Sequence, residues 1–200
     1  MRRTITIVAA VAVILGLSAS VASAHKRHWW PHKPAGTVVE VAVKASSANG
    51  PDANPYDYDL LIAAVTATGL APTLADQSQR FTVFAPNDRA FEKLVADLTG
   101  SFPASEQATL DAVLATFTPD QIKNILLYHV VAGRTLGPLQ VLFAGSLTMA
   151  NGGTVRPRGL VLKDETPALR DPRLLLYGLN LRASNGVIHT IDRVLVPATL

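Results

Sequence analysis

Hydrophobic positions recur with a helical period in the first half of the chain. Tyr58, Leu61, Ile62 and Val65 fall at i, i+3, i+4 and i+7, and Gly69 follows where a helix would end. This spacing places the four side chains on one face of a helix. It predicts an amphipathic helix over residues 58–69 that turns this face toward a core.

Capping signals predict more helices toward the middle of the chain. Asn87-Asp88 supplies a cap for one helix, and the helical spacing returns over residues 110–117. Residues 118–121, TPDQ, combine a capping box with proline at the first helical position. The helix that begins there runs into the segment LLYHVVAG at 126–133.

Strand-like patterns dominate the second half. RFTVFAP at 80–86 predicts an early strand, whereas TVVEVAVKA at 37–45 is a short apolar segment of ambiguous type. From Leu139 onward the apolar runs are short and β-like, and they are separated by Gly-rich and Pro-rich breaks. Helices in the first half and strands in the second favour an α+β fold over an alternating parallel sheet.

The last apolar segment, SNGVIHTIDRVLVP at 184–197, contains one histidine on an apolar face. Val187, His189 and Ile191 share a face if the segment is a strand, since side chains two apart point the same way. The alternation fails at the charged pair Asp192-Arg193, where we expect the strand to bulge or end. The pattern predicts that His189 is a core residue and that Asp192 lies at the strand end or in solvent.

The N-terminus predicts export. Residues 1–24 place Arg2 and Arg3 ahead of an apolar segment and end in Ala22-Ser23-Ala24, which is typical of a cleaved signal peptide. The apolar segment is shorter than the roughly 20 residues that span a bilayer, so we expect no permanent membrane anchor. The mature chain is expected to begin at His25 and to be secreted, extracellular or associated with the cell surface.

Composition narrows the classes of partner and the source of stability. Apolar residues make up 48% of the chain and charged residues 16%, as in a globular protein. Without the two arginines of the signal peptide, the basic residues fall from 18 to 16 against 15 acidic ones, a balance that argues against nucleic acid as a partner. The chain has no cysteine, so packing alone must stabilise it outside the cell.

Residues 25–36, HKRHWWPHKPAG, form a distinct segment without a helical or strand period. They hold three of the five histidines and both tryptophans, Trp29 and Trp30, and we expect a flexible tail. Imidazoles in such a tract could bind a transition metal, but the spacing matches no closed site. The alternative is that the indole rings contact a surface or a polymer.

Three segments, FTVFAPNDRAF at 81–91, LLYHVVAG at 126–133 and SNGVIHTIDRVLVP at 184–197, together resemble the fasciclin domain, with its two conserved boxes and central Tyr-His pair. The resemblance covers about residues 37–197, and we assign 37–200 to this domain. It implies a wedge of two β-sheets with helices packed on one side, in secreted or surface proteins associated with cell adhesion and matrix contact.

The chain departs from the fasciclin pattern at two places. The interval between the first two segments is longer than usual, so the region from about Asp97 to Phe117 is expected to be an extended or extra helix. Animal matrix members carry an Asp-Ile pair linked to integrin recognition, and Asn180 and Leu181 stand at the matching positions. The missing carboxylate argues against integrin-type binding.

Catalytic arrangements compete with a structural role for the buried histidines. Ser184, His189 and Asp192 could form a hydrolytic set, but on a strand Asp192 lies on the face opposite His189. His129 with His189 could form a metal pair, but no third ligand stands at a readable spacing. We expect both histidines to be core residues, with Tyr128 and His129 contacting different neighbours and Asp88 a candidate partner for them.

These observations lead to one leading function and two alternatives. The leading hypothesis is a secreted, non-enzymatic protein, expected to be monomeric, that mediates adhesion or binds an extracellular polymer or surface protein. The first alternative is a small-ligand carrier with a cleft between sheet and helices. The second, which ranks below it, is a hydrolase. We expect neither a cofactor nor a metal. The candidate binding residues are Trp29, Trp30, Tyr128, His129, Asn180 and Leu181.

Overall fold

A computed structural model describes residues 36–46 and 50–200, which lie within one compact unit, His32–Leu200. The helices are α1 (Val38–Lys44), α2 (Asp59–Ala67), α3 (Ala71–Leu74), α4 (Asp88–Thr99), α5 (Glu106–Thr116), α6 (Pro119–Leu127) and α7 (Pro138–Leu142). The strands are β1 (Phe81–Pro86), β2 (Val130–Ala132), β3 (Leu147–Thr148), β4 (Thr154–Arg158), β5 (Val161–Lys163), β6 (Leu174–Ala183) and β7 (Gly186–Ile191). The predicted signal peptide and all of the tail except Gly36 lie outside the described residues.

The strands form two sheets, as expected for the fasciclin-like wedge. One sheet has the order β2-β1-β7-β6, and the other has the order β3-β4-β5. At the centre of the larger sheet, β1 and β7 pair in parallel from Phe81 opposite Gly186 to Pro86 opposite Ile191. The two segments most characteristic of the sequence are therefore neighbours in space, although about a hundred residues separate them.

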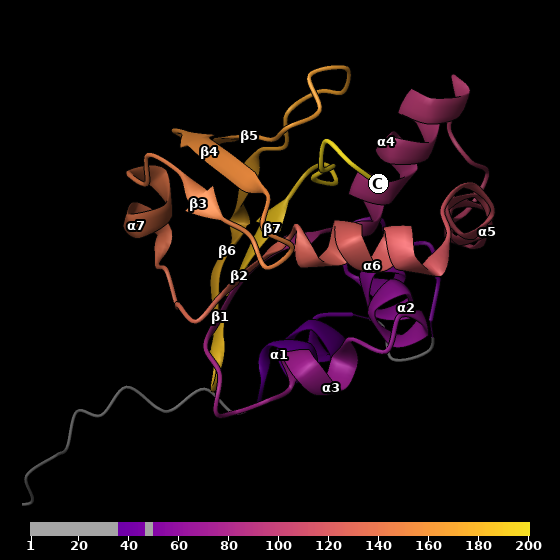
Figure 1. Cartoon of the computed structure of the whole chain (residues 1–200). Coiled ribbons are helices and arrows are strands. Elements are labelled where there is room, and N and C mark those ends of the chain that lie inside the picture. Colours follow the sequence, from indigo (N-terminus) through magenta and orange to yellow (C-terminus); the bar gives the residue numbers. More distant parts are fainter. Residues whose placement is uncertain (1–35, 47–49) are drawn as a thin grey trace, which may run out of the picture. The chain divides into compact units, whose positions relative to one another are not determined.

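The larger sheet has a core on each face. Figure 1 shows α1 to α6 on one side of it and the smaller sheet with α7 on the other. Along β1, Phe81, Val83 and Ala85 pack in the helix-side core, while Phe84 packs in the core between the sheets. Because both faces are covered, every residue of β1 and β7 is buried. The alternation of β1 thus divides apolar side chains between two cores.

Local capping explains most of the helices that the sequence predicts. Gly69 has a φ of +67° just beyond α2, and Asn87 accepts a hydrogen bond from the N–H of Ala90 to cap α4. Thr118 and Gln121 form the capping box of α6. These predictions are confirmed, and the described helices lie mostly in the first half of the chain.

Two short segments needed the structure to assign them. The ambiguous segment at 37–45 is the helix α1, which begins with a capping box between Thr37 and Glu40. The prediction that only β-like runs follow Leu139 is wrong, because α7 occupies Pro138–Leu142. Proline at its first position and a glycine before it start this single helical turn. The interval from Asp97 to Phe117 holds the end of α4 and a separate helix, α5.

No described helix has both the length and the apolar character that a membrane crossing requires.

Candidate functional site

Tyr128 and His129 are buried at the end of α6, and each has its own hydrogen-bond partners. The Tyr128 hydroxyl donates to the carbonyl of Thr154 at 2.7 Å. His129 Nδ1 lies 2.7 Å from the carbonyl of Ile125, and its Nε2 accepts a hydrogen bond from the N–H of Leu195 at 2.9 Å. Since a carbonyl only accepts and an N–H only donates, His129 is neutral with the proton on Nδ1.

His189 has the opposite tautomer. Its Nδ1 accepts from the N–H of Asn180 at 3.1 Å, so the proton lies on Nε2, which faces the carbonyl of Leu136 at 2.8 Å. Burial lowers the pKa of His129 to about 4 and also lowers the pKa of His189, because charging either ring inside the core is unfavourable. The prediction that His189 is a core residue is confirmed by its complete burial.

The hydrolytic set and the histidine metal pair do not form. Asp192 follows the end of β7, where its carboxylate accepts from the N–H of Arg173 at 2.7 Å and lies 3.6 Å from Lys93. The ring nitrogens of His129 and His189 all face backbone groups. Neither imidazole therefore has a nitrogen available for Asp192 or for a metal ion.

The prediction that Asp88 is a partner of Tyr128 or His129 is wrong. Its two carboxylate oxygens accept hydrogen bonds from the N–H groups of Asp59, at 3.1 Å, and Leu60, at 2.9 Å. Asp88 thus caps α2 from the first turn of α4, and Tyr58, the residue before α2, supplies no cap of its own. The carboxylate joins two helices rather than stabilising a histidine.

Asn180 and Leu181 lie where the pairing of β6 with β7 shifts register. Asn180 has a φ of +68°, a left-handed conformation that asparagine tolerates better than most residues. Asn180 lines a hollow together with Gln140 and Arg182, and Leu181 packs against the helix-side core. Trp29 and Trp30 lie outside the described residues.

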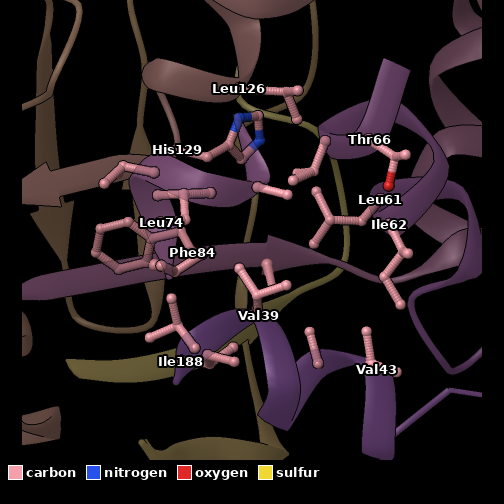
Figure 2. Close-up of a pocket in the computed structure, with 17 residues that line it drawn as sticks. Val39, Val43, Leu61, Ile62, Thr66, Leu74, Phe84, Leu126, His129 and Ile188 are labelled. Carbon is pink, nitrogen blue, oxygen red and sulfur yellow. The ribbon is translucent and has the colours of Figure 1, made fainter. Parts of the chain in front are cut away.

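An apolar cleft of about 110 Å³ lies among α1, α2, α3 and β1. Figure 2 shows Val39 and Val43 pointing into it from α1 and Leu61 from α2, with His129 at its margin. The other lining side chains are aliphatic apart from Phe84 and Thr66. The cleft can therefore accept an apolar group, but it offers few polar atoms to orient one.

Large apolar side chains are exposed on two elements around the sheets. On the edge strand β6, Leu176 is 70% exposed and Tyr177 is 62% exposed. Leu139 of α7 is 68% exposed, and Phe143, which directly follows the last residue of this helix, is 83% exposed. Single exposed apolar residues are common on proteins, but where several lie together they offer a surface for a partner.

A cluster of carboxylates that the sequence analysis did not identify lies where three helices begin. Asp59, Asp88 and Glu106 are the first residues of α2, α4 and α5, and all three are buried. Burial is the main cause that raises the pKa of Asp59 to about 6, of Glu106 to about 7 and of Asp88 to about 9. A hydrogen bond with the nearby Asp57 raises the pKa of Asp88 further.

The spacing of acidic residues along the chain does not predict this cluster. Asp52, Asp57 and Asp59 are close in sequence, but acidic residues ahead of a helix are ordinary caps. Asp88 and Glu106 come from later helices, and only the packing of these helices brings the side chains together.

Comparison with known proteins identifies the family. The model of the Fasciclin domain family matches residues 57–197. Protein sll1483 of Synechocystis sp. is 29% identical over 161 residues, covering 80% of this chain and 73% of that protein. A second Synechocystis protein, sll1735, is 30% identical over 142 residues, covering 70% of this chain and 89% of that protein.

Two further matches belong to longer chains. The pig transforming growth factor-beta-induced protein ig-h3 is 28% identical over 144 residues, which cover 70% of this chain and 18% of ig-h3. The solved pair of FAS1 domains from the insect cell adhesion molecule Fasciclin I superposes with a TM-score of 0.54 at 17% identity. That superposition covers 82% of this chain and 51% of the insect chain, and it shows a shared fold.

Proposed function

The chain belongs to the fasciclin family, and from this premise we propose that it is an exported, non-enzymatic adhesion protein that binds an extracellular polymer or a surface protein. The family includes adhesion proteins such as the insect Fasciclin I. The observation that carries the proposal is the set of large apolar side chains exposed on β6 and at α7, Phe143 and Leu176 among them, because such side chains offer a partner apolar contact area.

The hydrogen bonds of the two buried histidines support the non-enzymatic part of the proposal. A general base needs a ring nitrogen that can take a proton from a substrate, and both nitrogens of His129 and His189 face backbone groups inside the cores. Burial also disfavours their charged forms. Both residues are better suited to joining the sheet to the segments around it.

We propose that the tail of residues 25–36 contributes to attachment when the partner is a glycan or wall polymer. Trp29 and Trp30 offer indole faces for stacking and an N–H donor for polar ligands. The exposed side chains of β6 and α7 would then extend the contact from the folded domain. Asn180 is a weaker candidate, because it lacks the carboxylate present in the animal matrix members.

A sedimentation assay with cell walls of the producing organism tests these assignments. Deleting residues 25–36 is expected to reduce attachment, and replacing the exposed Phe143 and Leu176 by serine is expected to reduce it further. Asn180→Asp is expected to change attachment little, and aspartate also tolerates the left-handed backbone there. Unchanged attachment after the deletion would remove the tail from the site, and a clear gain with Asn180→Asp would move the site to β6.

The apolar cleft favours a second candidate function, the carriage of a small apolar ligand. A cavity of roughly 150 Å³ in another protein holds a benzene molecule, whereas typical ligand pockets exceed about 300 Å³. At about 110 Å³, the cleft is smaller than either, so it accepts a short branched chain rather than a whole larger ligand. For this reason we rank the carrier below the adhesion protein.

A cavity-filling variant tests the carrier. Val39→Phe, in the wall of the cleft, is expected to abolish binding of a small apolar probe such as xenon without affecting attachment to cell walls. If xenon shows no saturable effect on the parent protein in NMR spectra, the carrier hypothesis is wrong.

A further inference from the structure

The carboxylate cluster at the start of α2, α4 and α5 contains more acceptors than donors. The backbone supplies two N–H groups to Asp88, and the N–H of Asp52 donates to Glu106 Oε2 at 2.7 Å. The buried atoms Asp59 Oδ2 and Glu106 Oε1 have no hydrogen-bond partner among the described residues. Each of these two residues is less than 5% exposed, so bulk water cannot replace the missing donors.

Cations in the described part of the chain do not compensate this cluster. The four ion pairs found there use Glu92, Asp192, Asp171 and Asp97 as their acids. The positive ends of the three helix dipoles lie near the carboxylates, but each corresponds to only about half an elementary charge. Buried carboxylates without a counter-charge must hold protons or bind a metal ion.

We propose that Asp59, Asp88 and Glu106 bind one Ca²⁺ ion, with Asp52 and Asp57 on its outer side. One oxygen from each of the three buried carboxylates lies within 4.8 Å of the other two, and Asp52, Asp57 and Asp59 form a second group of the same dimensions. Two oxygens bound to one Ca²⁺ at about 2.4 Å are separated by at most about 4.8 Å. The two groups share Asp59, and Asp52 is exposed, which provides an entrance from solvent.

The chemistry of the ligands favours Ca²⁺ over other ions. The ligands are all carboxylate oxygens, which suit hard cations rather than the transition metals that prefer imidazole or thiolate. Mg²⁺ dehydrates reluctantly and usually binds through one or two carboxylates while it keeps several waters, whereas Ca²⁺ accepts many carboxylate oxygens in flexible geometry. An ion at this place would join three helix N-termini and would stabilise the folded domain.

Calorimetry and thermal unfolding of the full mature chain, stripped with EDTA, test the site. CaCl2 is expected to bind with a stoichiometry of one and, at a hundred times its Kd, to raise Tm by about 5 to 10 °C. MgCl2 is expected to bind at least about tenfold more weakly.

Two variants that change a carboxylate to an amide test the ligands. Asp59→Asn and Glu106→Gln are each expected to weaken Ca²⁺ binding at least about tenfold and to remove most of the Tm shift. Both should fold in EDTA, because each removes a like charge from a buried cluster. Asp111→Asn, on the exposed face of the same helix as Glu106, is the control and should bind Ca²⁺ as the parent does.

Two results would overturn the proposal. Absence of saturable binding at about 10 mM CaCl2, above the range of weak extracellular Ca²⁺ sites, would mean that shared protons neutralise the cluster. Unchanged Ca²⁺ binding in both Asp59→Asn and Glu106→Gln would place the ion elsewhere. Neither result bears on attachment to cell walls, so the site and the adhesion function fail separately.

Discussion

His129 offers a quantitative test, because its replacement should have a larger effect at neutral pH than in acid. In His129→Ala, the N–H of Leu195 and the carbonyl of Ile125 lose their partner inside the core. An unpaired buried polar group costs about 1 to 3 kcal/mol, and the cavity left by the ring adds to this. We expect the free energy of unfolding at pH 7 to fall by about 4 kcal/mol.

The pH dependence follows from the lowered pKa of His129. A histidine whose pKa is lowered by folding stabilises the folded state fully at pH values above 6.5, its pKa in the unfolded chain. This stability is lost as the pH falls toward about 4, its pKa in the folded chain. The gap between these values corresponds to about 3 kcal/mol. The parent loses this contribution between pH 6.5 and 4 and the variant does not, so the difference between them should shrink to about 1 kcal/mol at pH 4.

Urea unfolding followed by circular dichroism at pH 7 and pH 4 measures both values. Val141→Ala is a suitable control, because Val141 is fully buried and does not titrate, so its effect should be the same at both pH values. An equal effect of His129→Ala at pH 7 and pH 4 would refute the argument that His129 is held neutral by burial. A small effect at both would show that the ring is exposed.

Three further predictions concern other parts of the chain. Asn185→Ala is expected to lower the free energy of unfolding by about 3 to 5 kcal/mol, measured by urea unfolding, because the buried amide accepts from the N–H of Val38 and donates to the carbonyls of Leu74 and Asp76. Gly186→Ala should lower the urea midpoint sharply, since a Cβ there would overlap the Phe81 carbonyl, whereas Gly145→Ala should leave it unchanged because its Cβ meets open space. Mass spectrometry of protein recovered from culture medium should find His25 at the N-terminus, and intact Met1 on that species would contradict the predicted signal peptide.

The sequence by itself determined the features that depend on neighbours along the chain. Helices such as α2 and α6 follow from apolar side chains three and four apart and from caps within one turn, and both signals are local. The burial of His189 follows from the alternation around it, because its neighbours two positions away are aliphatic. The family resemblance belongs to the same level, since it rests on three short segments.

Short elements and long-range pairings were decided by the tertiary structure. The segments of α1 and α7 are too short for a period to separate helix from strand, and packing against the rest of the domain selects the helix. Asp88 could have capped its own helix, but it caps α2 instead because α2 and α4 pack with their N-termini together. The carboxylates of Asp59 and Glu106 meet for the same reason: burial and proximity arise from how helices pack, and a linear pattern does not contain those distances.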